Sequence, residues 1–286
     1  MNNIYKLQNK PENQRLVVSQ YFVYKKAKRL SLLLFVISTI LPVGFNLSLI
    51  WIRNELIATI FSFISICIIF LSEIIKYCIE KNKYNAALIQ QKFDTIVFGF
   101  DNVFCFKEEI IDYYVEKYKN KDWNRKKDWY PDYGKKDKNT SVFYCQKENI
   151  DWTSNLSFKY IFFLVLCTVL LALTITVNLI INNNTIGSII SLLIIGTPLL
   201  SYVCSGFFKI KKCNNSLKNI LDYSNQVDYC IQKNGVVENK TVENLQWMIF
   251  SFRQEQFLIP DWFEKLFYRN ISKLESKKAK KRRKSR

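Results

Sequence analysis

Four long segments of the chain contain no Asp, Glu, Lys or Arg and are dominated by apolar side chains. They are residues 31–52, 56–72, 160–181 and 185–208. A helix needs about 20 apolar residues to cross the roughly 30 Å hydrocarbon core of a bilayer. Only RNE separates the first two segments, and only NNN separates the last two. The pattern predicts four transmembrane helices in two tight hairpins; buried core helices of a soluble protein are the less favoured alternative.

Apolar residues at three- and four-residue spacings continue beyond the second and fourth segments. Such spacing places side chains on one face of a helix. The spans are therefore expected to extend into a cytoplasmic stalk that transmits movement to the membrane, and a simple helical overhang is the equal alternative. The two stripes are Ile74, Cys78, Ala86, Ile89, Phe93, Ile96 and Val97, and then Ile210, Cys213, Leu217, Leu221 and Val227.

The predicted fold class is an all-α membrane protein, with four transmembrane helices in two hairpins and a mainly helical cytoplasmic region. Further helices are predicted at 107–118, 237–257 and 261–274, whereas residues 120–141 are rich in turn formers and charge. The predicted divisions are an N-terminal cytoplasmic helix (1–30), the first hairpin (31–72), a stalk with a basic and aromatic loop (73–159), the second hairpin (160–208), a second stalk with C-terminal helices (209–275) and a disordered basic tail (276–286).

Basic residues outnumber acidic residues by 42 to 24, and their distribution predicts the orientation in the membrane. Residues 1–30 hold seven Lys or Arg against one acid, whereas the hairpin turns hold one Arg and no Lys. Because basic segments stay on the cytoplasmic side, both termini and residues 73–159 are predicted to be cytoplasmic. The last ten residues contain eight Lys or Arg. Anionic lipids attract such segments, so membrane association is the simplest role for the tail.

The composition argues against an enzyme. The chain has no histidine and only seven glycines, so it lacks Ser-His-Asp and Cys-His arrangements and a glycine-rich phosphate loop. None of its eight cysteines forms a CxxC pair, and Cys67, Cys167 and Cys204 fall inside predicted spans. Reduced structural thiols are therefore expected in place of a zinc site. No catalytic residue, metal or cofactor is predicted.

A basic and aromatic segment lies between the hairpins. Arg125, Lys126 and Lys127 precede Trp129 and Tyr130. Cations interleaved with aromatic rings suit phosphate groups and nucleobases, which bind through charge and stacking. These five residues are therefore candidate ligand-binding residues. A solvated loop, whose rings anchor it to the protein or to the membrane interface, is the alternative.

Five short blocks, taken in their order relative to the spans, resemble one family. They are QYFVYKKAK (20–28), IQQKFD (89–94), DWYP (128–131), CQKENIDW (145–152) and IPDWF (259–263). Together they resemble the SMODS-associated four-transmembrane effectors over nearly the whole chain, apart from the basic tail. The hydrophobic residue usual before CQ is Tyr144 here. The resemblance implies a bacterial antiphage system of the cyclic-oligonucleotide type, CBASS. In such a system a nucleotidyltransferase makes a cyclic nucleotide, and the effector damages the inner membrane.

The prediction is an effector of the bacterial cytoplasmic (inner) membrane that senses a cyclic nucleotide and permeabilises the membrane, causing abortive infection. The candidate ligand-binding set also includes Gln146 and Lys147, and the structural set is Gln90, Phe93, Asp94, Asp261 and Trp262. The polar span residues Asn46, Ser48, Thr174 and Thr176 either line an opening or satisfy partners between helices.

The predicted partners are membrane lipid, a cyclic oligonucleotide and further copies of the chain, without a specific nucleic-acid polymer. One four-span chain is too small to enclose much of a pore, so a homo-oligomer is expected. The alternative function is a noncatalytic membrane anchor or scaffold that recruits a cytoplasmic partner.

Overall fold

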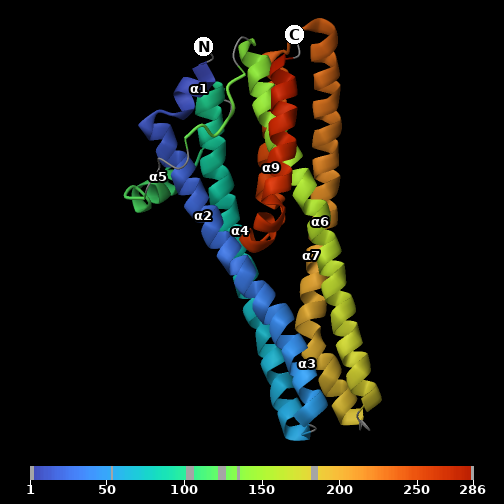
Figure 1. The fold of residues 1–286 in the computed structure, drawn as a ribbon. Coiled ribbons are helices and arrows are strands. Elements are labelled where there is room, and N and C mark those ends of the chain that lie inside the picture. Colours follow the sequence, from blue (N-terminus) through green and yellow to red (C-terminus); the bar gives the residue numbers. More distant parts are fainter. Residues whose placement is uncertain are drawn as a thin grey trace.

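The structure, a computed structural model, describes residues 3–52, 54–100, 106–121, 127–133, 136–181 and 186–284. Within these ranges every regular element is a helix (Figure 1). The elements are α1 (Asn3–Gln8), α2 (Pro11–Phe35), η1 (Val36–Ile40), α3 (Leu41–Ile52), α4 (Glu55–Phe98), α5 (Glu108–Lys117), α6 (Lys138–Ile181), α7 (Ile186–Asn234), α8 (Asn239–Glu255) and α9 (Asp261–Lys284). Four of the described helical runs are long and apolar enough to cross a membrane. The predicted all-α membrane architecture is confirmed.

The first hairpin consists of an unbroken helical run from α2 through η1 to α3, followed by α4. η1 is a π-helical turn just before Pro42, in which the backbone N–H of Leu41 donates to the carbonyl of Val36. Proline lacks an N–H and its ring crowds the carbonyl four residues earlier, so the helix widens locally. After the hairpin turn, Asn54 Oδ1 accepts two hydrogen bonds, at 2.9 and 3.3 Å, from backbone N–H groups in the first turn of α4. This cap starts α4.

The second hairpin consists of α6 and α7, and both helices continue far beyond the membrane-spanning part. α6 begins where Asp137 Oδ2 accepts a hydrogen bond of 3.0 Å from the backbone N–H of Thr140. With 44 residues it is about 66 Å long, roughly twice the hydrocarbon thickness of a bilayer. The polar residues 143–159 are therefore part of the same rigid helix as the third span.

Both hairpin turns lie at one end of the molecule and both termini lie at the other (Figure 1). Near the turns the hairpins meet through a small apolar cluster of Leu49, Ala58, Leu192 and Ile195. Toward the opposite end the hairpins diverge, and α9 lies between them (Figure 1). α8 contacts α4, α6 and α7. The C-terminal helices therefore join the two hairpins at the end opposite the hairpin turns.

The structure differs from the expectation of a disordered tail at 276–286, because α9 extends to Lys284. Lys, Arg and Ala are good helix formers and continue the helix. Lys278 Nζ lies 3.2 Å from Asp151 Oδ2 of α6, and Lys159 Nζ lies 4.2 Å from the ring centre of Phe267. α9 thus carries its basic residues toward the end opposite the hairpin turns (Figure 1), away from the spans.

Polar side chains of the spans bond mainly within their own helices. Asn46 donates to the carbonyl of Pro42 (3.0 Å), Ser48 to Phe45 (2.8 Å) and Thr176 to Ala172 (2.8 Å), and Thr174 is half-buried. Between elements, the hydroxyl groups of Ser38 in η1 and Ser72 in α4 lie 3.1 Å apart. In this arrangement the polar side chains of the spans form hydrogen bonds with the backbone of their own helix or with a neighbouring helix.

A buried lysine joins α4 to the segment between α8 and α9. Lys83 Nζ lies 2.5 Å from Glu80 Oε2 and donates a hydrogen bond of 3.0 Å to the carbonyl of Gln256. Glu80 also pairs with Lys209 of α7. Burial, together with the positive charge of Lys209, lowers the pKa of Lys83 to about 8. The cluster thus joins the helical extensions of both hairpins to one another.

The lowered pKa of Lys83 predicts that stability rises with pH above about pH 8. The ordinary pKa of lysine is 10.5, so in this window the unfolded chain binds more protons than the folded chain, and alkali favours folding. Between about pH 7.5 and 9.5, the unfolding free energy of the wild type should rise by on the order of 2 kcal/mol relative to Lys83→Met. Thermal unfolding in detergent micelles at several pH values measures the difference. Identical pH dependence of the two proteins would contradict the assignment.

Candidate functional site

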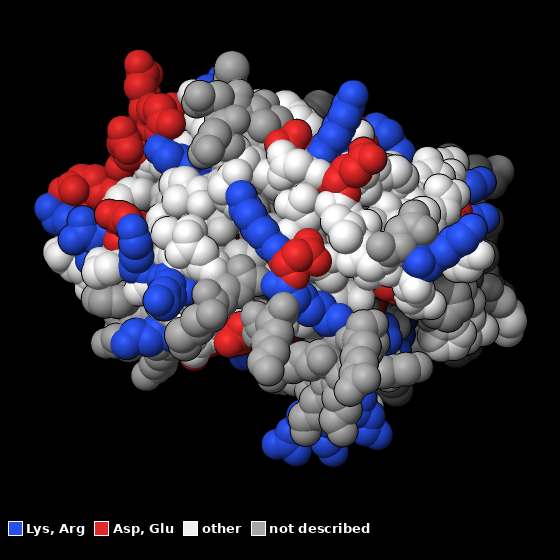
Figure 2. Space-filling model, turned by 90° about the horizontal axis from the view of Figure 1, so that it is seen from above, with Lys and Arg blue, Asp and Glu red and all other residues white. Residues whose placement is uncertain are grey.

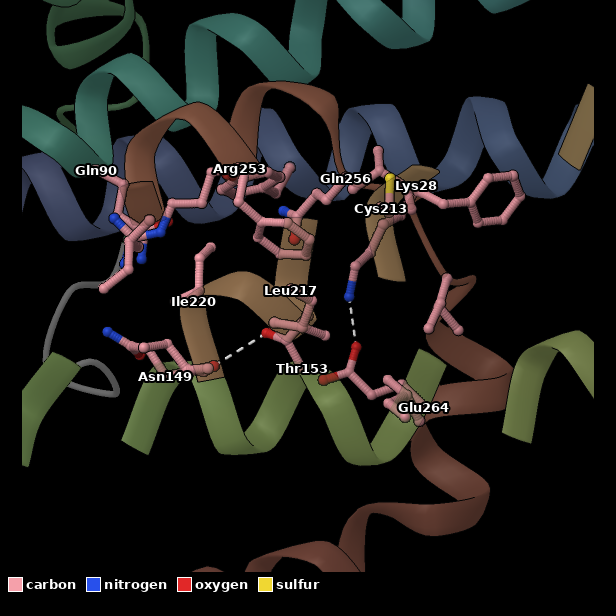
Figure 3. Close-up of a pocket in the computed structure, with 18 of the residues that line it drawn as sticks. Lys28, Gln90, Asn149, Thr153, Cys213, Leu217, Ile220, Arg253, Gln256 and Glu264 are labelled. Carbon is pink, nitrogen blue, oxygen red and sulfur yellow. Dashed lines mark hydrogen bonds and ion pairs between the residues drawn. The ribbon is translucent and has the colours of Figure 1, made fainter. Parts of the chain in front are cut away.

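A cavity of about 580 Å³ lies among the helices of the two hairpins, in the part of the molecule beyond the spans (Figure 3). Small-molecule sites typically measure about 300–1,000 Å³. The apolar part of its wall includes Ile210, Leu217, Ile220, Ile249, Phe252 and Ile259. The polar part includes Gln20, Tyr24, Lys28, Gln90, Asn149, Arg253, Gln256 and Glu264. The wall therefore draws on α2, α4, α6, α7, α8 and α9.

One helix face of α2 contributes a polar row to the cavity, because Gln20, Tyr24 and Lys28 are spaced four residues apart. Lys28 Nζ lies 2.5 Å from Glu264 Oε2 and 2.9 Å from Asp261 Oδ1 of α9. Burial opposes protonation of Lys28, but the two carboxylates outweigh it and raise the pKa of Lys28. These ion pairs join the start of α9 to the helix that continues into the first span.

Asp94 of α4 is fully buried and binds three side chains, one from the loop before α6 and two from α8. Its carboxylate accepts hydrogen bonds from Tyr130 Oη (2.5 Å), Gln246 Nε2 (3.0 Å) and Arg253 Nη1 (2.6 Å). Burial and the charge of Asp94 raise the pKa of Tyr130 well above its usual value. Burial opposes ionisation of Arg253, but Asp94 raises the pKa of Arg253. The ionised Asp94–Arg253 pair thus holds α8 and Tyr130 against α4.

Three glutamines extend this network to α6. Gln246 Nε2 donates to Gln91 Oε1 of α4 at 2.8 Å, and Gln246 Oε1 accepts a hydrogen bond of 3.0 Å from Gln146 Nε2 of α6. Gln146 Nε2 also donates to the carbonyl of Val242 at 2.9 Å. Buried polar networks of this kind fix a single relative arrangement of the helices that they join. Here the network joins α4, α6 and α8 beside the cavity.

Three buried polar atoms of the cavity-lining residues have no hydrogen-bond partner within the described ranges. They are Arg253 Nη2, Gln20 Oε1 and the hydroxyl oxygen of Tyr24, and the residues Arg253 and Gln20 are only 6% and 1% exposed. A buried polar group without a partner costs about 1–3 kcal/mol. A guanidinium donor is suited to phosphate oxygens, and an amide oxygen accepts from N–H or O–H groups. The cavity therefore offers a donor and an acceptor that a ligand can satisfy.

The predicted basic and aromatic loop contributes to the cavity only in part. Trp129 and Tyr130 line it. Lys127 is exposed and is not part of the lining, whereas Arg125 and Lys126 lie outside the described residues. The aromatic members of the predicted set are thus the ones that the described structure brings to the site.

The other two predicted ligand-binding residues lie between helices. Gln146 belongs to the glutamine network, and Lys147 Nζ lies 2.6 Å from Asp228 Oδ2 and 3.3 Å from Asn225 Oδ1 of α7. Both side chains are buried and neither lines the cavity. The face of α6 that lines the cavity instead carries Asn149 and Thr153 (Figure 3). The reason is helical periodicity, which directs neighbouring residues to different sides.

The predicted structural residues take three kinds of position. Gln90 lines the cavity (Figure 3), and the ring of Phe93 stacks on Tyr130 with centres 6.2 Å apart. Asp94 and Asp261 form the ion pairs described above. Trp262 packs edge-on against Phe163 of α6 at 5.3 Å. Asp94 therefore serves the architecture of the cavity wall without lining the cavity itself.

Sequence reasoning missed Arg253, Lys28 and Gln20 as site residues. Two signals point to them. Arg253 lies on the apolar stripe of α8, four residues after Ile249, where a charged side chain is out of place. Gln20 and Lys28 share the four-residue repeat of α2. Within the described residues, no group of three or more Cys, Asp or Glu could hold a metal ion.

Comparisons with known proteins give one match. A family model described as the SMODS-associating 4TM effector domain matches residues 2–281. No curated protein and no solved structure matches the chain. The family match extends from α1 into α9 and ends at residue 281, three residues before the end of that helix.

Loss of the Asp94 carboxylate is expected to destabilise the protein strongly. Asp94→Asn leaves the Arg253 charge buried without a counterion, which costs about 3–5 kcal/mol. Tyr130→Phe removes one hydrogen bond to a charged acceptor and should cost about 1.5–3 kcal/mol. The control is Asp112→Asn on the exposed face of α5, with a change within about 0.5 kcal/mol. Unfolding in mixed detergent micelles measures all three. Equal stability of Asp94→Asn and Asp112→Asn would contradict the proposed role of Asp94.

Proposed function

The chain belongs to the family of SMODS-associating 4TM effector domains, and on this premise we propose that it senses a cyclic oligonucleotide and permeabilises the membrane. Membership makes it a multi-pass membrane effector of a CBASS-type system. In this proposal the cyclic oligonucleotide binds in the cytoplasmic cavity, and the spans form the opening in the membrane. Arrest or death of the infected cell follows from loss of the membrane barrier.

The observation that carries the proposal is the continuity between the cavity wall and the spans. Lys28 lies three residues before the first uncharged segment, in the same helical run. Thr153 and Tyr160 line the cavity from α6, which continues into the third span, and Ile210 lines it from α7, which emerges from the fourth. Helices are stiff over these distances. A ligand that spreads the cavity wall therefore moves the spans without an intervening linker.

The cavity also has the chemistry that a nucleotide needs. Trp129 provides an aromatic face for a base, and Arg253 and Lys28 provide cationic donors for phosphate. Gln90 and Asn149 provide amides for base edges or sugar hydroxyl groups. On the end face of the molecule, described Lys and Arg side chains are interspersed with acidic and uncharged ones (Figure 2). The cavity is therefore a better-defined ligand site than this end face.

The resting arrangement is maintained by contacts between the hairpins. The cluster of Leu49, Ala58, Leu192 and Ile195 lies near the hairpin turns, and Ser62 Oγ donates to the carbonyl of Ser191 at 3.4 Å. A ligand shifts the protein to another state only by as much as it binds that state more tightly. Ligand binding in the cavity must therefore offset the loss of these contacts between the spans.

The proposed location is the bacterial cytoplasmic membrane, with both termini in the cytoplasm. Its support is the excess of basic residues before the first span, which the positive-inside rule places in the cytoplasm. The common position of the termini, opposite both hairpin turns, is compatible with this orientation (Figure 1). Because four helices enclose little space, the proposed opening is formed by several copies.

Trp129 is expected to contribute to ligand affinity through stacking. Trp129→Ala should weaken binding of the cognate cyclic nucleotide by roughly five- to hundredfold, since stacking on one base contributes about 1–3 kcal/mol. Trp247→Ala is the matched control, because Trp247 is 42% exposed on α8 and does not line the cavity. Calorimetry on detergent-solubilised protein provides both affinities. Equal affinities in folded variants would remove Trp129 from the site.

Activation is expected to abolish the membrane potential. Cells that express the wild type should grow almost normally until its nucleotide is supplied, and should then lose potential before nucleotide pools fall. Cells with Trp129→Ala should need more nucleotide for the same effect. A potential-sensitive dye and a membrane-impermeant DNA stain report the two steps. Growth arrest with intact potential and intact impermeability would reject permeabilisation and favour a membrane scaffold.

A further inference from the structure

The charges around the cavity limit the number of phosphate groups that its ligand can carry. Among the described lining residues, only Lys28 and Arg253 are cationic, and Glu148 and Glu264 are anionic. Arg253 already pairs with Asp94 behind the wall. The described residues of the cavity wall therefore carry no excess of positive charge, although the whole chain has a net charge of +18.

Each of the two cations retains a way to bind one phosphate group. Arg253 directs Nη1 to Asp94, and its Nη2 has no partner among the described residues. Lys28 pairs with Glu264 and Asp261, and an ammonium group has three N–H donors. Figure 3 places Lys28 on the side of Glu264 and Arg253 on the side of Gln90. The cavity thus has two separate cationic positions.

We infer that the ligand is a cyclic dinucleotide, with one phosphodiester at Arg253 Nη2 and the other at Lys28. The inference rests on the proposed sensing function and specifies its ligand class. Among the described lining residues, a third phosphodiester would find no further cation, and it would either be buried unpaired or lie near Glu148. Burial of an unpaired charge is strongly unfavourable. Charge balance therefore favours two nucleotides over three.

The direct test compares ligands of different size on the full-length protein. Detergent-solubilised wild type is titrated by calorimetry with all 3′,3′-linked cyclic dinucleotides of the common bases and with the matching cyclic trinucleotides. At least one dinucleotide should bind, and more tightly than any trinucleotide by at least about tenfold, because the third charge has no partner. A trinucleotide that binds as tightly as the best dinucleotide would overturn the inference and leave the sensing function standing. If no cyclic nucleotide binds, the sensing function itself fails.

A second test uses a gain of affinity, which a misfolded variant cannot produce. Glu264 and a phosphodiester compete for Lys28, so Glu264→Gln should tighten dinucleotide binding by roughly three- to tenfold. Lys28→Gln should weaken it by at least about tenfold, and Lys28→Arg should retain most of it because the charge remains. Weaker binding by Glu264→Gln, or unchanged binding by folded Lys28→Gln, would exclude Lys28 as a phosphate ligand.

Discussion

The ion pair between Asp94 and Arg253 is the interaction on which the helical region beyond the spans depends. The pair joins α4, which continues from the second span, to α8. Asp94 also accepts a hydrogen bond from Tyr130 of the loop between the hairpins. Neither charge can be removed alone without leaving the other buried and unpaired. The pair also leaves one guanidinium nitrogen for the cavity. This one ion pair therefore stabilises the packing of α8 on α4 and positions the Arg253 side chain at the proposed ligand site.

The second constraint is the absence of flexible linkers between the spans and the cavity. α6 and α7 each run without a break from the helices around the cavity into the membrane-spanning segments, as does the run from α2 to α3. Lys83, Glu80 and Lys209 join the hairpin extensions between the cavity and the spans. In the proposed mechanism, a change in the cavity wall reaches the spans through these continuous helices, and it costs the disruption of contacts between the hairpins.

For ligand binding, the location of the charged side chains matters more than the net charge of the chain. The chain is strongly basic, but the cavity-lining cations are balanced by carboxylates, and the basic residues of α9 extend toward the end opposite the hairpin turns. Net charge alone would suggest a site for a polyanion. The local balance favours a small ligand with few phosphate groups, because each buried charge needs its own partner.

Four spans, two hairpins and helical extensions could be predicted from the sequence, because uncharged segments of membrane length and three- to four-residue spacing depend on local order alone. Trp129 and Tyr130 could be selected for the site by their chemistry. Arg253, Lys28 and Gln20 could not be placed there, since they lie far apart along the chain and reach one cavity only when α2 and α8 both pack against α4. The same packing turned Gln146 and Lys147 toward α8 and α7, although Asn149 on the same helix lines the cavity.

Local pattern thus determined which segments are helices and which cross the membrane. The tertiary structure decided which side of each helix meets the cavity, because that depends on the rotation and crossing of helices that the sequence specifies only through their mutual packing.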